Sequence, residues 1–100
     1  MNINKNDKQI YFNQVRGVIT EMNDAPLYCS ITLKVGHESF RYVNLSLKKE
    51  LFEQLLANFT IGDKVTAKFF VSSNNKNGRW FSNINLLSLD KISESELLEI

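Results

Sequence analysis

The chain has 100 residues, of which 43% are apolar and 23% are charged, and its formal net charge is +1. This length suits about one domain, which buries roughly two thirds of the surface of its unfolded chain without needing a disulfide or a metal. The only cysteine, Cys29, excludes an internal disulfide and a cysteine zinc cluster. The chain opens without a basic-then-apolar leader, and no apolar run approaches the ~18 residues of a membrane span. We therefore expect a cytoplasmic protein that does not contact membranes.

The charges are distributed unevenly along the chain. Residues 1–89 carry eleven basic and seven acidic side chains, whereas residues 90–100 carry four acidic side chains and one basic one. The first nine residues are rich in Asn and Lys and poor in apolar side chains. This pattern predicts a flexible arm over residues 1–9, a folded domain over 10–90, and an acidic tail or short helix over 91–100.

Alternation of apolar and polar residues predicts five strands, over residues 10–22, 27–35, 38–47, 64–73 and 79–89. An apolar stripe at helical spacing, comprising Leu51, Phe52, Leu55, Leu56 and Phe59, predicts one helix over 47–58, with Ser46 as its N-cap. The apolar parity of the strands predicts an interior made of Val15, Gly17, Ile19, Cys29, Ile31, Leu33, Val35, Val43, Leu45, Leu47, Val65, Ala67, Phe69, Val71, Trp80, Ile84 and Leu86.

Breaks in the strand pattern carry further information. Gly17 permits the sharp coil or bulge that a closing sheet requires. Leu87 and Leu89 break the alternation of the last strand, which indicates a bulge or a strand end that is buried on both sides. Residues 73–78, rich in Asn and containing Lys76, have the composition of a flexible loop. One short helix between the third and fourth of five strands is the connectivity of the OB-fold, a small Greek-key barrel. The sequence therefore predicts a mainly β protein with this barrel.

Two motifs resemble known OB proteins. The segment Phe59-Thr60-Ile61-Gly62-Asp63-Lys64-Val65 resembles the helix-to-strand junction of bacterial single-stranded DNA-binding proteins, and Asn77-Gly78-Arg79-Trp80-Phe81 resembles the last hairpin of small bacterial OB proteins. With Val15-Arg16-Gly17, the resemblance covers about residues 10–90 and implies a small bacterial, phage or mobile-element type of single-strand binder. The chain departs from that family in lacking its Gly-rich linker and its run of aspartates ending in Pro-Phe.

The sequence does not favour catalysis. His37 is the only histidine and adjoins a hairpin glycine, and Cys29 alternates with buried apolar residues. No Gly-rich phosphate loop, histidine pair or His-acid set is present. We therefore expect a non-enzymatic protein without a metal or cofactor.

Aromatic and basic side chains are interleaved on the parity that faces away from the predicted core. Rings exposed to water in this way can stack on bases while neighbouring cations hold phosphates. The candidate nucleic-acid-binding residues are Arg16, Tyr28, Lys34, Phe40, Tyr42, Lys68, Phe70, Lys76, Arg79 and Phe81. The sequence thus predicts a protein that binds single-stranded DNA, or RNA, with little sequence preference, in DNA replication, recombination or repair.

Other interpretations stay open. The same rings suit a protein-interaction module, such as an accessory subunit of a polymerase, primase or helicase, or plain packing across strands. Residues 91–100 can dock as a helix, recruit replication proteins or compete with DNA for the basic face. A homo-oligomer would enlarge a binding site that is small in one copy.

Overall fold

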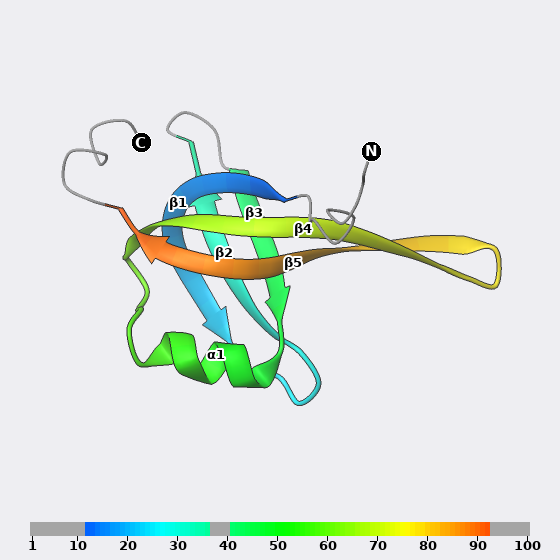
Figure 1. The fold of residues 1–100 in the computed structure, drawn as a ribbon, viewed down its shortest axis with the longest axis horizontal. Helices are drawn as coiled ribbons and strands as arrows, with labels where there is room; N and C mark the ends of the chain where they lie inside the picture. Colours follow the sequence, from blue (N-terminus) through cyan, green and yellow to red (C-terminus); the bar gives the residue numbers. More distant parts are fainter. Residues whose placement is uncertain (1–11, 37–40, 93–100) are drawn as a thin grey trace, which may run out of the picture.

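Residues 12–36 and 41–92 are described by the computed structural model, and they form a closed five-stranded barrel with one helix (Figure 1). The elements are β1 (Asn13–Asn23), β2 (Cys29–Val35), β3 (Arg41–Leu47), α1 (Lys49–Leu56), β4 (Lys64–Lys76) and β5 (Arg79–Lys91). The strand order is β1-β2-β3-β5-β4, and β4 pairs back onto β1. A closed five-stranded barrel with its helix between β3 and β4 is the OB-fold architecture, so the predicted fold class is confirmed.

The barrel closes because β1 is shared between two neighbours. Its first half, from Asn13 to Val18, pairs with β4, and its second half, from Val18 to Asn23, pairs with β2. Gly17 lies at this change of partner, where a Cβ atom would come within 2.6 Å of the Lys34 carbonyl oxygen. The ladder with β2 then shifts register between Ile19 and Glu21. The glycine and the bulge together let one strand bend across the barrel wall, as the sequence predicts.

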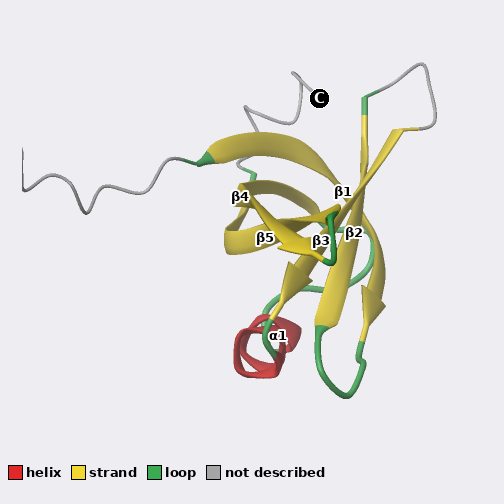
Figure 2. Ribbon diagram, turned by 90° about the vertical axis from the view of Figure 1, so that its right-hand side faces the viewer, coloured by secondary structure: helices red, strands yellow, loops and turns green. Residues whose placement is uncertain are grey.

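The core consists of side chains that point inward from all five strands. Its buried strand residues are Ile19, Cys29, Ile31, Leu33, Leu45, Leu47, Val65, Ala67, Leu86 and Leu89. The helix α1 lies across one end of the barrel, where Phe52 and Leu55 are buried (Figure 2). Leu56, predicted to belong to this buried stripe, is instead exposed on the outer side of the helix.

The helix is shorter than predicted, and Ser46 is not its N-cap. Ser46 belongs to β3, where it pairs with Ser30 of β2 and with Asn85 of β5. Because the ladder holds this residue, the helix begins later, with Lys48 in the N-cap position and no side-chain capping hydrogen bond. Residues 10 and 11 of the first predicted strand and 38–40 of the third lie outside the described residues, and β2 begins at Cys29 rather than Leu27.

The largest departure from prediction is the length of β4 and β5. Each has 13 residues, whereas β2 and β3 have 7 each. Their far ends, residues 71–76 and 79–84, leave the barrel as a two-stranded ribbon, called the arm below, which extends to the right in Figure 1. The predicted loop over 73–78 is wrong, because the ladder continues to the pair Lys76 and Arg79.

A two-residue turn closes the arm. Asn77 and Gly78 have φ angles of 52° and 80°, the pair of positive values that a tight hairpin turn of type I′ requires. The amide of Gly78 donates a hydrogen bond to Asn75 Oδ1 at 3.2 Å. Val71 and Trp80, predicted to lie inside, are both exposed, because no other strand faces this part of the ribbon.

The predicted bulge in the last strand is confirmed. Lys68 pairs with Ser88 and Phe69 with Leu86, so Leu87 is the extra residue. This shift lets both Leu86 and Leu89 face the core although three positions separate them. Strand β5 then continues to Lys91, and Ile92 is buried, whereas the remainder of the predicted tail, 93–100, and the predicted arm over 1–9 lie outside the described residues.

Candidate nucleic-acid interface

A cleft of about 500 Å³ lies where the β1–β2 loop, the β3–α1 junction and the base of the arm meet. Tyr28 and Phe70, two of the predicted stacking residues, line the same cleft although 42 positions separate them in the sequence. Its lining comprises Tyr28, Ser46, Leu47, Lys48, Glu50, Leu51, Gln54, Phe70, Asn85 and Leu86. The cleft therefore combines aromatic rings with amide and charged groups, the mixture typical of ligand-binding clefts.

The loop that carries Tyr28 is tied to the helix. Lys49 Nζ lies 3.1 Å from Asp24 Oδ1, and the Cys29 thiol donates to the same carboxylate oxygen at 3.5 Å. The hydrogen bond from Lys49 is the main reason that the pKa of the Asp24 carboxyl lies below its ordinary 3.8. These contacts hold the loop at the rim of the cleft, where the Tyr28 ring remains 64% exposed.

Asn85 organises the base of the arm. Its side-chain amide donates to the Ser72 hydroxyl at 3.0 Å and to the carbonyl oxygen of Phe70 at 3.3 Å. The same residue pairs with Phe70 in the β4–β5 ladder and with Ser46 in the parallel β3–β5 contact. Asn85 therefore joins the barrel wall to the arm at the edge of the cleft.

The arm continues the outer surface of the barrel away from this cleft. Residues paired across an antiparallel ladder lie on the same side of it, and alternate residues share a face. One side, called the front face below, consists of Phe70, Ser72, Asn74 and Lys76 on β4 and Arg79, Phe81, Asn83 and Asn85 on β5. A row of two rings and two cations therefore leads from the cleft to the tip.

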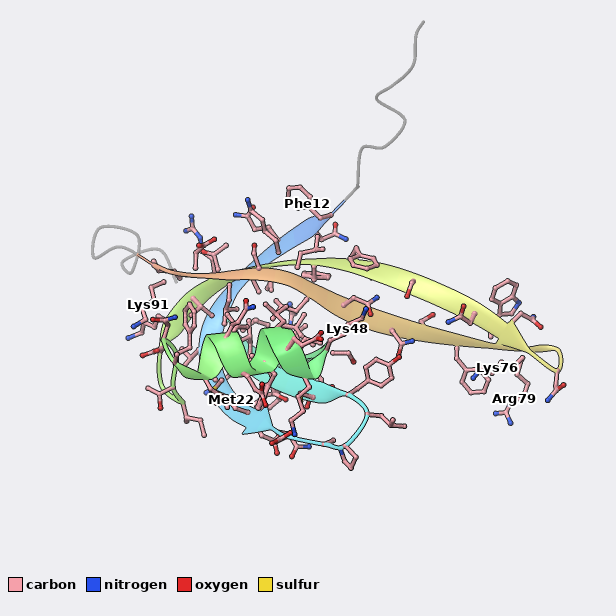
Figure 3. The ribbon with its side chains drawn as sticks, turned by 60° about the horizontal axis from the view of Figure 1, so that its bottom comes forward. Phe12, Met22, Lys48, Lys76, Arg79 and Lys91 are labelled. Carbon is pink, nitrogen blue, oxygen red and sulfur yellow. The ribbon has the colours of Figure 1, made fainter. Side chains whose placement is uncertain are left out.

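The tip concentrates the charge of the front face. Lys76 and Arg79 are cross-strand partners, and the Arg79 guanidinium lies 5.8 Å from the centre of the Phe81 ring, which is 48% exposed. Figure 3 shows both cations at the far end of the ribbon and Lys48 between the barrel and the arm. Residues 64–89 contain four basic and no acidic side chains. The carboxylate that lines the cleft, Glu50, comes from the helix. The front face thus has the charge that attracts phosphate groups.

The remaining predicted site residues lie on two other parts of the barrel. Lys34 and Tyr42 are partners in the β2–β3 ladder, on the outer wall of the barrel. They lie near the end of β2 that is farther from Tyr28, and Tyr42 is 55% exposed. Arg16 and Lys68 belong to the paired segments of β1 and β4, and Lys68 Nζ lies 5.3 Å from the centre of the Phe12 ring. Phe40 lies outside the described residues. The nine predicted residues that the structure describes therefore do not form one continuous row.

Three residues near the interface are not among the candidate binding residues predicted from the sequence. Lys48 and Gln54 line the cleft from the β3–α1 junction and the helix, and Trp80 lies near the arm tip. The Asn-Gly pair at 77–78 is the signal that could have revealed the arm, since this dipeptide favours a two-residue hairpin turn rather than a flexible loop. Strands β4 and β5 must extend beyond the barrel to reach a turn at these two residues.

Residues 12–36 and 41–92 contain neither a metal-binding cluster nor a membrane-spanning helix. These residues include no group of three or more His, Cys, Asp or Glu side chains placed to hold a metal ion. None of their helices is both long enough and apolar enough to cross a membrane. Comparison with models of protein families and with curated proteins gave no match to this chain.

Proposed function

We propose that this protein binds single-stranded nucleic acid, DNA in the first instance, through the cleft and the front face of the arm. Binding would involve no catalysis and little sequence preference. Tyr28, Phe70 and Phe81 would stack on bases, while Lys48, Lys76 and Arg79 would contact phosphates. A role in DNA replication, recombination or repair, in the cytoplasm, would follow from such an activity.

One observation carries the proposal: two rings and two cations lie along one exposed face of the arm, and residues 64–89, which contain this face, include no carboxylate. Any base offers a face for stacking, worth roughly 1–3 kcal/mol per base, so the affinity would not depend strongly on sequence. The cations would neutralise phosphates and release counterions. The OB-fold supports the proposal only as an analogy, since this fold also hosts other functions.

Position along the barrel also supports this choice. OB-folds bind their ligands on the face of the second and third strands, bordered by the loops between strands 1 and 2 and between strands 4 and 5. In this protein the first of those loops carries Tyr28, and the second connection is the arm. Lys34 and Tyr42 lie on the β2–β3 wall itself, so they are candidates for a longer binding path.

The alternative is a protein-interaction module, supported by the exposed apolar side chains of Tyr28, Leu27 and Leu56 around the helix end of the barrel. Dependence on salt separates the two functions. Three phosphate contacts, at ~0.7 per phosphate, would give a slope of about −2 when the logarithm of the binding constant is plotted against the logarithm of salt concentration. An aromatic protein interface would respond much less.

The test is a fluorescence-anisotropy titration of labelled oligo-dT at several salt concentrations. We expect Tyr28→Ala combined with Phe81→Ala to weaken binding by about tenfold or more with an unchanged salt slope, because stacking is lost and phosphate contacts remain. Lys76→Ala combined with Arg79→Ala should instead reduce the salt slope by ~1.4.

Tyr42→Ala serves as the matched control, since it removes another exposed tyrosine from the β2–β3 wall. A loss of affinity as large as that of the double variant, Tyr28→Ala with Phe81→Ala, would extend the binding path onto that wall. Repeating the titration with oligo-U compares RNA with DNA. Failure of the unmodified protein to bind either oligonucleotide at low salt would refute the proposed function.

A further inference from the structure

The arm has a second exposed side that the proposed single-strand path does not use. This back face consists of Val71, Ser73 and Asn75 on β4 and Trp80, Ser82 and Ile84 on β5. Trp80 is 70% exposed and Val71 is 53% exposed. The back face continues the side of β4 and β5 that faces inward in the barrel. Its apolar side chains therefore lie beyond the core that would cover them.

The arm is a regular ribbon rather than an open loop. Its ladder is continuous from Phe70 and Asn85 to Lys76 and Arg79, and its turn has two residues. The hydroxyl groups of Ser73 and Ser82 lie 2.9 Å apart across the back face. At ~3.4 Å per residue, the ribbon projects about 20 Å from the barrel. Ribbons of this kind enter DNA grooves or place an apolar side chain between stacked bases.

The two faces differ in charge. Lys76 and Arg79 lie on the front face, whereas the back face carries only neutral side chains around Trp80. A DNA strand can therefore be held through its phosphates on the front face alone. The back face offers the flat indole ring, which suits an exposed base pair better than a phosphate backbone.

We propose that the arm tip recognises the junction between single-stranded and double-stranded DNA. The single strand runs along the front face past Phe81 to the cleft, and the last base pair of the duplex stacks on Trp80 at the back. The ribbon then lies between the single strand and the end of the duplex, and Lys76 and Arg79 hold the single strand. This inference rests on the proposed function, because it requires a single strand on the front face.

The experiment compares three DNA probes: an oligo-dT of about ten nucleotides, which is within the ~4–16 that one OB-fold covers, a blunt duplex, and that duplex with the same oligo-dT as an overhang. Both overhang polarities are used. We expect the junction with the preferred polarity to bind about tenfold more tightly than free oligo-dT, because it adds one stacking contact.

Trp80 is the only tryptophan, so quenching of intrinsic fluorescence reports contact at the tip directly. Junction DNA should quench it strongly, and short oligo-dT should not.

Trp80→Ser should abolish the tighter binding of the junction and leave affinity for oligo-dT unchanged. Phe81→Ser, the matched change on the other face, should weaken binding of oligo-dT and preserve the ratio of the affinity for the junction to the affinity for oligo-dT.

Equal affinity for junction and oligo-dT with either polarity would refute the junction proposal while leaving single-strand binding intact. A Trp80 emission that shifts with protein concentration alone would also overturn it, because the back face would then bind a second copy of the chain. Absence of binding to oligo-dT would instead reject the underlying function.

Discussion

The arm consists of the far halves of β4 and β5, whose near halves belong to the barrel, yet the two regions differ in burial. In the barrel, β4 and β5 bury Val65, Ala67, Leu86 and Leu89 against the other strands and the helix. In the arm, the same alternation continues through Val71, Ile84 and Trp80 with no opposing wall. The comparison shows that parity along a strand establishes which residues share a face, whereas burial of that face depends on whether another element covers it.

The two regions are also stabilised differently. Barrel residues gain free energy from removing apolar surface from water, about 25 cal/mol per Å². The arm instead depends on its backbone ladder and on polar cross-strand pairs, Ser73 with Ser82 and Asn85 with Ser72. An isolated two-stranded hairpin is only marginally stable in water, so the arm depends on the barrel that anchors its base. We expect it to open locally far more readily than the core.

The sharpest test of this comparison removes one aromatic ring from each region. Phe52→Ala should destabilise the protein by about 3–5 kcal/mol, because it empties a buried site between the helix and the barrel. Trp80→Ala should change the free energy of unfolding by less than about 0.5 kcal/mol, since the ring is exposed. Urea titration followed by circular dichroism measures both. A loss of more than about 2 kcal/mol at Trp80 would mean that the arm is part of the cooperative core.

A pair of glycines gives a smaller contrast. Gly17→Ala should cost about 1–3 kcal/mol, because its Cβ would overlap a backbone oxygen of β2 that cannot move without disturbing the barrel. Gly78→Ala meets no atom within 4 Å but keeps a strained positive φ of 80°. It should therefore loosen only the arm.

Amide hydrogen exchange distinguishes these two outcomes. In the Gly78→Ala protein, exchange should speed up across the arm, while the core strands retain the protection of the unmodified protein. In the Gly17→Ala protein, the most protected amides of the barrel should also exchange faster. Equal acceleration throughout the Gly78→Ala protein would contradict the independence of the two regions.

The smallest expected effect concerns Asp24 and Lys49 at the rim of the cleft. Because the pKa of Asp24 in the folded protein is lowered, chiefly by its hydrogen bond with Lys49, this pair stabilises the fold above the ordinary pKa of 3.8 and ceases to do so as the pH falls through the lowered value. Asp24→Asn should therefore lower the melting temperature slightly at pH 7 and leave it unchanged in strong acid. The pair is exposed, so the shift is small. An identical shift at both pH values would exclude the ion pair as its cause.

Much of the fold was predictable from local patterns, because alternation and helical spacing report directly on contact with a core. Within the described residues, they correctly predicted the number and order of the elements, the bulge near Gly17 and the bulge at Leu87. The outward parity of Phe70, Phe81 and Arg79 also followed from alternation, whereas Lys76 belongs to the segment predicted to be a loop. What alternation could not supply is distance around a closed sheet, so it grouped Arg16, Lys34, Lys68 and Tyr42 with residues on other walls.

Sequence alone determined which side chains share a face of each strand, since that depends only on the two-residue period of extended backbone. The tertiary structure decided where the barrel ends, and therefore that Val71 and Trp80 face water although they have core parity. It also decided which distant segments meet, bringing Tyr28 of the β1–β2 loop to the same cleft as Phe70 of β4. The physical reason is that local periodicity carries no information about the closure of a sheet, which is set by pairing between residues far apart in the chain.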